Sequence, residues 1–150
     1  MEVRVTSDAF DPGTEANAFI DRTQGAGAAV TFTGIVRSKA EDPILALELE
    51  CYVELARSQI GAIVAEAASR FSLLDATVIH RHGRLVPGEP IMQVMTAAPH
   101  REDAFRGAQF LMDYLKTDAP FWKKEVTPTG ERWVEAKAED DKARERWVKD

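Results

Sequence analysis

The feature that most constrains this 150-residue sequence is the stretch from Pro99 to Lys124, a helical pattern stopped by a proline. Apolar residues recur there at three- and four-residue steps from Phe105 to Leu115, the spacing of one helix face. Pro120 cannot continue a helix and disfavours helical backbone just before it, so we expect the helix to end there. Two large aromatics and two lysines follow directly, in the order Phe121, Trp122, Lys123 and Lys124.

The length of this helix restricts how its charged ends can cooperate. His100 and Arg101 lie at its start and Lys116 at its end, about 24 Å away at the helical rise, too far for one small-molecule pocket to use both ends. Lys116 and Lys123 can share a pocket, because the Pro120 turn folds the chain back. If the His-Arg pair serves that pocket too, it must come from a second copy of the chain, in a symmetric dimer with sites at the interface.

Composition predicts a single cytoplasmic domain, residues 1–137, followed by a charged tail, residues 138–150. The formal net charge of −6 argues against a general nucleic-acid binder, which needs a broad basic surface. No apolar run is long enough to span a bilayer, and the N-terminus lacks the pattern of a signal peptide. The single cysteine suits a reducing compartment.

Periodicity predicts a mixture of strands and helices. We expect strands over 2–6, 28–37, 44–52, 77–81 and 91–97, helices over 14–21 and 54–71, and a hairpin of 124–127 with 132–136. Gly34 marks a bulge or a close backbone approach in its strand. Because hairpins are interspersed with helices, the predicted class is α+β.

Cys51 and the histidines have alternative interpretations. Cys51 could carry a persulfide, but it falls on the apolar face of its strand without a neighbouring positive charge, so we expect an inert thiol and little effect of Cys51→Ala. His80 and His82 share a strand face and could hold zinc with a third ligand. No cysteine- or histidine-rich partner has the required spacing, so we expect no metal.

The lysines after the helix pattern are the strongest candidates for chemistry. Surface lysines near a helix end are ordinarily only solvated. Here two aromatics and a proline fix the segment, and a rigid loop bearing cations suits an anion site or a site that stabilises an oxyanion. Arg37 and Arg101 are further candidates, because arginine makes forked contacts with phosphate or carboxylate.

Several longer segments resemble one known family. They are FTGIVRS (32–38), HRHGRLVPGE (80–89), HREDAF (100–105), MDYLKTDAPFWKKE (112–125) and GERWVEAK (130–137). In this order they are similar to the large, catalytic subunit of molybdopterin synthase, and the likeness runs from about Val3 to Lys137. The chain departs at 50–55, where the family usually has Glu-His-Tyr-Pro-Gly-Met, and in a shorter loop after Arg37.

The resemblance implies an activity and an assembly. The family adds two sulfurs to cyclic pyranopterin monophosphate, forming the dithiolene of molybdopterin. The sulfur arrives on the thiocarboxylated C-terminal glycine of a small ubiquitin-like subunit, whose tail enters a pocket of the large subunit. Two large subunits form a central homodimer with one small subunit at each outer end, a heterotetramer. The implied fold is an α/β-hammerhead with an additional antiparallel sheet, and we expect no resident cofactor.

The resemblance also implies roles for individual residues. Lys116 and Lys123 match the catalytic lysines, which would stabilise negative charge as sulfur attacks and the acyl group leaves. The substrate-binding residues would be Arg37 in the pocket, Phe32 and Met112 in its walls, and His100 and Arg101 donated by the neighbouring large subunit toward the substrate phosphate. The alternative to this enzyme is a dimeric module that binds a ubiquitin-like tail or a phosphorylated metabolite without catalysis.

Overall fold

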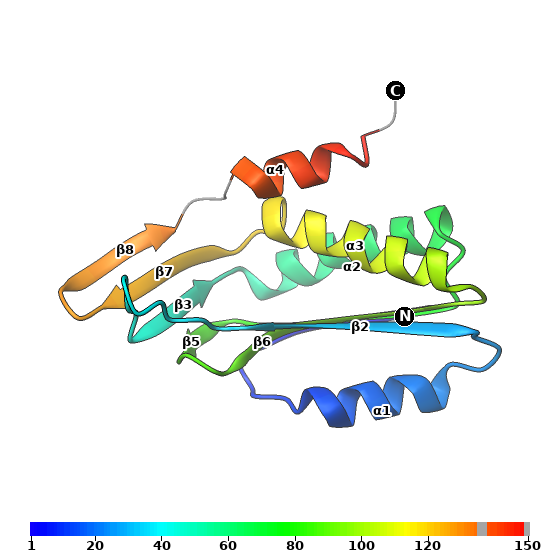
Figure 1. Cartoon of the computed structure of the whole chain (residues 1–150), viewed down its shortest axis with the longest axis horizontal. Coiled ribbons are helices and arrows are strands. Elements are labelled where there is room, and N and C mark those ends of the chain that lie inside the picture. The colour runs from blue at the N-terminus through cyan, green and yellow to red at the C-terminus, as the bar shows by residue number, and fades with distance from the viewer. Residues whose placement is uncertain (135–137, 149–150) are drawn as a thin grey trace.

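The computed structural model describes residues 1–134 and 138–148. These residues form eight strands and four helices (Figure 1). In chain order they are β1 (Glu2–Thr6), α1 (Pro12–Arg22), β2 (Ala28–Ile35), β3 (Ala46–Glu50), α2 (Val53–Arg70), β4 (Asp75–Arg81), β5 (Gly83–Leu85), β6 (Pro90–Ala98), α3 (Arg101–Thr117), β7 (Trp122–Thr127), β8 (Gly130–Val134) and α4 (Ala138–Glu145). The predicted α+β class is confirmed. Within the described ranges, no helix combines the length and apolar character needed to cross a bilayer.

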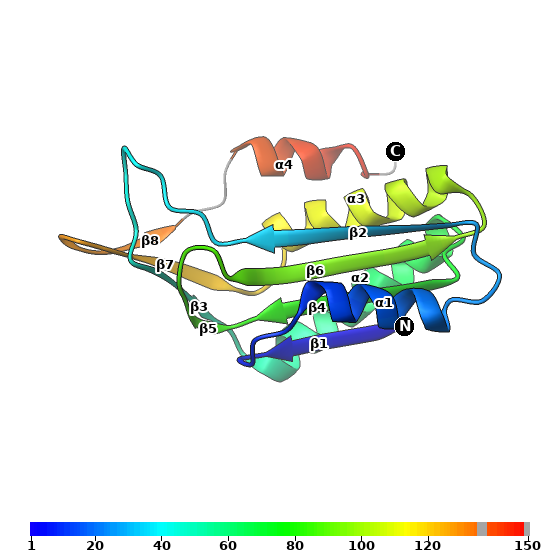
Figure 2. The same ribbon diagram turned by 60° about the horizontal axis from the view of Figure 1, so that its bottom comes forward.

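The first sheet is sandwiched between helices. Its strand order is β1-β4-β6-β2, with β1 parallel to β4 and the other neighbours antiparallel. α1 covers one face, and α2 and α3 cover the other (Figure 2). Residues of β4 contribute to the hydrophobic core on both faces of the sheet, because successive side chains of a strand point to opposite faces. Val78 packs in the core with α2 and α3, whereas Ile79 packs with Phe19 of α1.

The second sheet extends from one end of the first (Figure 1). Its order is β5-β3-β7-β8 and every pair is antiparallel, as the additional sheet implied by the resemblance should be. The expected hairpin is present as β7 and β8, although residues 135 and 136 lie outside the described residues. The sequence indicated no strand between those over 77–81 and 91–97. The three-residue strand β5 intervenes and pairs with β3, and it is too short to show a periodicity.

The bulge predicted at Gly34 is also present. The register of β2 against β6 shifts between Gly34 and Ile35. A Cβ atom at Gly34 would lie 2.9 Å from Met92 Cγ, so the two strands approach closely there. This bulge ends β2 just before Arg37, where the chain leaves the first sheet.

α3 is fixed along its length. Its buried residues are Ala104, Gly107, Ala108, Phe110, Leu111 and Leu115. Near its start, the Thr96 hydroxyl donates a hydrogen bond of 2.7 Å to the Ala104 carbonyl. Near its end, the Trp147 indole donates to the Asp113 carboxylate at 2.6 Å, and its buried ring packs edge-on against Phe110. α3 is therefore a rigid rod held by the sheet on one side and by the segment after α4 on another.

One ionisable residue of β4 lies in the interior. His80 is 2% exposed, and its register partners are Val5 on β1 and Met92 on β6. Burial and, to a smaller extent, the nearby charges of Lys123, Lys116 and His82 lower the pKa of the His80 imidazole from 6.5 to about 4, although its hydrogen bond with the Arg81 carbonyl acts in the opposite direction. His80 is therefore neutral in the folded protein at physiological pH.

The approach of Gly27 to Pro99 predicts a selective loss of stability. A Cβ at Gly27 would lie 2.1 Å from the Pro99 carbonyl oxygen, whereas a Cβ at Gly61, within α2, meets no atom within 4 Å. We expect Gly27→Ala to lower the free energy of unfolding by about 1–3 kcal/mol through strain. Gly61→Ala should raise it by about 0.5–1 kcal/mol. Urea denaturation checks both, and equal stability of the two variants would contradict the described packing.

Burial of His80 predicts a pH dependence of stability. The folded-state pKa lies below the unfolded-state value, so the unfolded chain takes up a proton first as the pH falls. Between pH 7 and pH 5 the wild type should lose about 2 kcal/mol of unfolding free energy through this group. His80→Phe should lack that component, whatever its stability at pH 7. Denaturant titrations at each pH measure the slope, and identical slopes for the two proteins would show that His80 titrates normally.

Candidate functional site

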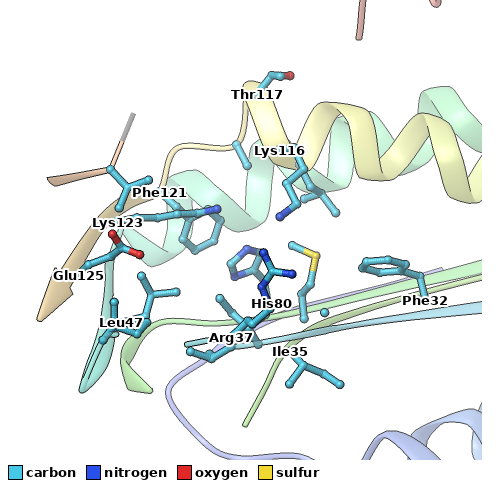
Figure 3. Close-up of a pocket in the computed structure, with 18 of the residues that line it drawn as sticks. Phe32, Ile35, Arg37, Leu47, His80, Lys116, Thr117, Phe121, Lys123 and Glu125 are labelled. Carbon is cyan, nitrogen blue, oxygen red and sulfur yellow. The ribbon is translucent and has the colours of Figure 1, made fainter. Parts of the chain in front are cut away.

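A pocket of about 570 Å³ opens where the end of α3, the chain after β2 and one face of the second sheet meet (Figure 3). Cationic side chains are prominent in its lining: Arg37, Lys39, Lys116 and Lys123. Two carboxylates, Asp42 and Glu125, also line it. Its apolar wall includes Phe32, Ile91, Met92, Leu115 and Phe121. The pocket therefore combines apolar surface with an excess of positive charge.

The structure brings Lys116 and Lys123 into this one pocket. Lys116 lies in the last turn of α3, and Lys123 is the second residue of β7. The Asp118 amide donates to the Tyr114 carbonyl at 2.8 Å, and the Phe121 amide donates to the Ala119 carbonyl at 2.8 Å. These bonds fix the reversal around Pro120 that the sequence predicted.

Strand alternation distinguishes Lys123 from Lys124. Lys123 and Glu125 face the pocket, so Lys124 must point to the opposite face of the sheet. There its ammonium lies 3.1 Å from the Glu48 carboxylate and 3.2 Å from that of Glu131. Hydrogen bonds to these two carboxylates raise the Lys124 pKa. Lys124 is therefore part of the sheet's surface ion pairs and faces away from the pocket.

The pocket carboxylates are both engaged by one arginine. Arg132 of β8 donates to Glu125 at 2.8 Å and to Asp42 at 2.7 Å. This arrangement fixes both acids and offsets their charge with a guanidinium. Each of the two acids therefore has a cationic partner on strand β8.

Of the predicted wall residues, Phe32 of β2 lines the pocket together with Arg37. Met112 of α3 is half-buried and packs against the main core cluster. The methionine in the pocket lining is Met92, which is brought there by the register of β6 with β2. The wall position of Met112 was implied by the resemblance alone, and the register that brings Met92 to the pocket cannot be read from the sequence.

His80 and Phe121 are pocket residues to which the sequence analysis gave no role there. Their rings stack with centroids 3.9 Å apart and an interplanar angle of 14°. The sequence feature that could have indicated the burial of His80 is the mostly apolar run of β4 that precedes it. Its contact with Phe121 depends on two elements far apart in sequence. The described residues contain no group of three or more His, Cys, Asp or Glu side chains placed to hold a metal ion.

His100 and Arg101 lie at the opposite end of α3 from the pocket. Both side chains are exposed, and His100 occupies the N-cap position. With seventeen helical residues from Arg101 to Thr117, the two ends are about 24 Å apart. Within one described protomer, this pair therefore does not join the pocket.

Cys51 lies in a separate surface hollow. Its neighbours there are Glu50, Tyr52, Trp122 and Trp133. Burial raises the pKa of the Cys51 thiol, which lowers the fraction of nucleophilic thiolate. Cys51 is half-buried and follows the end of β3, whereas the sequence placed it on the apolar face of a strand. The raised pKa supports the expectation of an inert thiol, which stays a prediction.

Comparisons with known proteins agree with this geometry. The family model described as "MoaE protein" matches residues 5–118. The molybdopterin synthase catalytic subunit of Cereibacter sphaeroides is 54% identical, over 98% of this chain and all of that protein. The subunit of that name from Escherichia coli is 48% identical, over 92% of each chain.

Solved structures give the same result. The molybdopterin biosynthesis MoaE protein from Burkholderia ambifaria has a TM-score of 0.81 and 44% identity, over 98% of each chain. Molybdopterin synthase from Staphylococcus aureus has a TM-score of 0.80 and 26% identity, over 88% of this chain and 96% of that one. The chain belongs to the MoaE family, the family of the molybdopterin synthase catalytic subunits.

Proposed function

We propose that this chain is the catalytic subunit of a molybdopterin synthase, a sulfurtransferase of molybdenum cofactor biosynthesis. It transfers two sulfurs from the thiocarboxylated C-terminus of a small ubiquitin-like carrier subunit to cyclic pyranopterin monophosphate, forming the molybdopterin dithiolene. The observation that carries the proposal is the convergence of Arg37, Lys116 and Lys123 on one partly apolar pocket whose carboxylates are engaged by Arg132. A cytoplasmic location accompanies it, in keeping with the free thiol of Cys51.

The pocket suits each half of a sulfur transfer. In the first half, the thiocarboxylate sulfur forms a bond to an electrophilic carbon of the pterin, and an oxygen substituent of that carbon leaves with the bonding electron pair and a proton. The carrier is then joined to the pterin through the sulfur, as a thioester. In the second half, water adds to the acyl carbon of the carrier, and the bond between that acyl carbon and the sulfur breaks. The carrier leaves as a carboxylate, and the sulfur stays on the pterin as a thiolate.

The two lysines have defined tasks in this sequence. Negative charge is present on the incoming thiocarboxylate, develops on the acyl oxygen when water adds, and ends on the departing sulfur. Lys116 and Lys123 are placed to stabilise that charge from two sides of the pocket. The sulfur belongs to the carrier, so the catalytic subunit needs no thiol of its own, in agreement with the surroundings of Cys51.

Binding of the substrate phosphate requires further cationic or hydrogen-bonding side chains. We assign His100 and Arg101 to it, supplied by a second copy of the chain across a homodimer interface. The support is the length of α3, which keeps this pair away from its own pocket. With one carrier subunit at each outer end, the assembly is a heterotetramer.

Lysine substitution separates the enzyme from a non-catalytic binding module. We expect Lys116→Ala and Lys123→Ala each to lower the single-turnover rate of molybdopterin formation by about 10²-fold or more, because each removes a charge-stabilising group. The assay combines the purified chain, the thiocarboxylated small subunit and the cyclic pterin. Binding of the small subunit, measured by calorimetry, should change far less than the rate.

Lys124→Ala is the matched control. It removes an adjacent lysine of β7 that faces away from the pocket and pairs with Glu48 and Glu131. It should keep the wild-type rate within about threefold, although it can lose some stability. Full turnover by the Lys116→Ala/Lys123→Ala double variant would contradict the proposed chemistry.

A further inference from the structure

The segment HRHGRLVPGE (80–89) is prominent in the sequence, yet the sulfur-transfer scheme gives its charged residues no task. It contains a buried arginine, Arg81, with 8% of its side chain exposed. A guanidinium is costly to bury unless specific groups pair with it. The groups that pair with Arg81 connect this segment to the backbone beside the pocket.

Arg81 forms an ion pair with Glu89, the last residue of the segment. Its Nη1 donates to Glu89 Oε2 at 2.7 Å, and its Nη2 donates to the Ser7 carbonyl at 3.2 Å. The other carboxylate oxygen of Glu89 accepts from the Val86 amide at 2.9 Å. The bond from the Val86 amide, and after it the bond from Arg81, lower the pKa of Glu89, so its carboxylate is charged at neutral pH.

Glu89 also closes a tight turn over residues 86–89. Its amide donates to the Val86 carbonyl at 3.1 Å, while the Val86 amide donates back to its carboxylate. Pro87 fixes one backbone torsion of the turn, and Gly88 has the positive φ, 94°, that a type II turn requires at this position. The turn is therefore closed by a backbone bond and by a side-chain bond.

This turn binds the residue that precedes Arg37. The Val36 amide donates to the Glu89 carbonyl at 3.0 Å, and the Gly88 amide donates to the Val36 carbonyl at 2.8 Å. Val36 is 4% exposed, and its side chain packs in a core cluster with residues of the second sheet. Both backbone groups and the side chain of Val36 are thus held.

The residue that follows Arg37 is held as well. The Ser38 hydroxyl accepts from the Ile44 amide at 3.0 Å. Arg37 itself is exposed and lines the pocket, so its side chain starts from backbone that is fixed on both sides (Figure 3). A long cationic side chain loses less freedom on meeting an anion when its starting point is already fixed.

We propose that Arg81 and Glu89 are positioning residues for Arg37: their ion pair holds the 86–89 turn, and the turn holds the backbone from which Arg37 reaches the anionic guest. The inference rests on the proposed function, because the guest is the one that the sulfur transfer brings to the pocket. The hold of the turn on Val36, however, can be measured without any reaction.

The first test follows amide hydrogen exchange. The Val36 and Gly88 amides should be protected in the wild type, because both donate to backbone carbonyls. Glu89→Ala should speed their exchange about tenfold or more relative to the amides of β4, which report on the stability of the core. Arg84→Ala is the matched control, since it removes an arginine of the same segment whose ion pair with Glu48 is exposed. It should leave the exchange unchanged.

Two results of this test would overturn the inference, whether or not the protein makes molybdopterin. One is unchanged protection of Val36 and Gly88 in Glu89→Ala. The other is an equal loss of protection at these amides and throughout β4, which would show that Glu89 stabilises the whole fold and not this turn.

The second test is kinetic and measures the single-turnover rate against the concentration of the cyclic pterin, with the small subunit at saturation. Arg37→Ala should raise the half-saturating concentration about tenfold or more, the loss expected for a hydrogen bond between charged groups. Glu89→Ala should raise it about fivefold and keep the maximal rate within about threefold, because the pocket lysines are unchanged.

Two further variants complete the kinetic series. Glu89→Gln keeps an oxygen that can accept from the Val86 amide but loses the ion pair, so it should raise the half-saturating concentration by less than Glu89→Ala. Arg84→Ala should match the wild type. An unchanged half-saturating concentration in Glu89→Ala, or a loss confined to its maximal rate, would overturn the inference.

A double-mutant cycle assigns the kinetic effect to Arg37. Glu89→Ala should weaken pterin binding by the wild type but cause no further loss in the Arg37→Ala protein, because the side chain that it positions is then absent. Equal losses in both backgrounds would reduce Glu89 to a general structural role and overturn the inference. Absence of product from the wild type would instead contradict the proposed function and leave the exchange test standing.

Discussion

The rigid length of α3 is the constraint on which the arrangement depends. The helix is buried along one side against the first sheet and clamped near its end by the bond from Trp147 to Asp113. It cannot bend to bring His100 and Lys116 together. Its start therefore offers an exposed His-Arg pair to the surroundings, while its end contributes Lys116 to the pocket. A site that needs both ends must be built from two copies of the chain.

The second sheet converts that helix end into a pocket. The reversal around Pro120 leads directly into β7, which pairs with β3 and presents Lys123 on the face toward α3. Arg132, from the neighbouring strand β8, engages the pocket carboxylates, and His80 supplies a neutral surface between the cations. Positive charge is thus concentrated in a pocket whose two acids are held by Arg132, which suits a guest that arrives as one anion and leaves as another.

Many elements of the fold and the shared position of the two pocket lysines could be predicted from sequence, because they depend on interactions between residues close together in the chain. Helical periodicity, the proline stop and strand alternation are all short-range, and they were sufficient for α2, α3, the hairpin and the shared pocket of Lys116 and Lys123. What was missed depends on contacts between distant segments. The stack of His80 on Phe121 requires β4 to meet the chain after α3, and the place of Met92 requires the register of β6 with β2. The three-residue strand β5 escaped because so short a segment has no period.

The proposed division of the site between two protomers can be tested by complementation. A His100→Ala/Arg101→Ala variant and a Lys116→Ala/Lys123→Ala variant, co-expressed with different affinity tags, can be purified in succession to isolate mixed dimers. Each parent dimer should be nearly inactive, whereas the mixed dimer contains one intact site of two and should regain about half of the wild-type activity. A mixed dimer as inactive as its parents would place all four residues in one protomer's site and contradict the account.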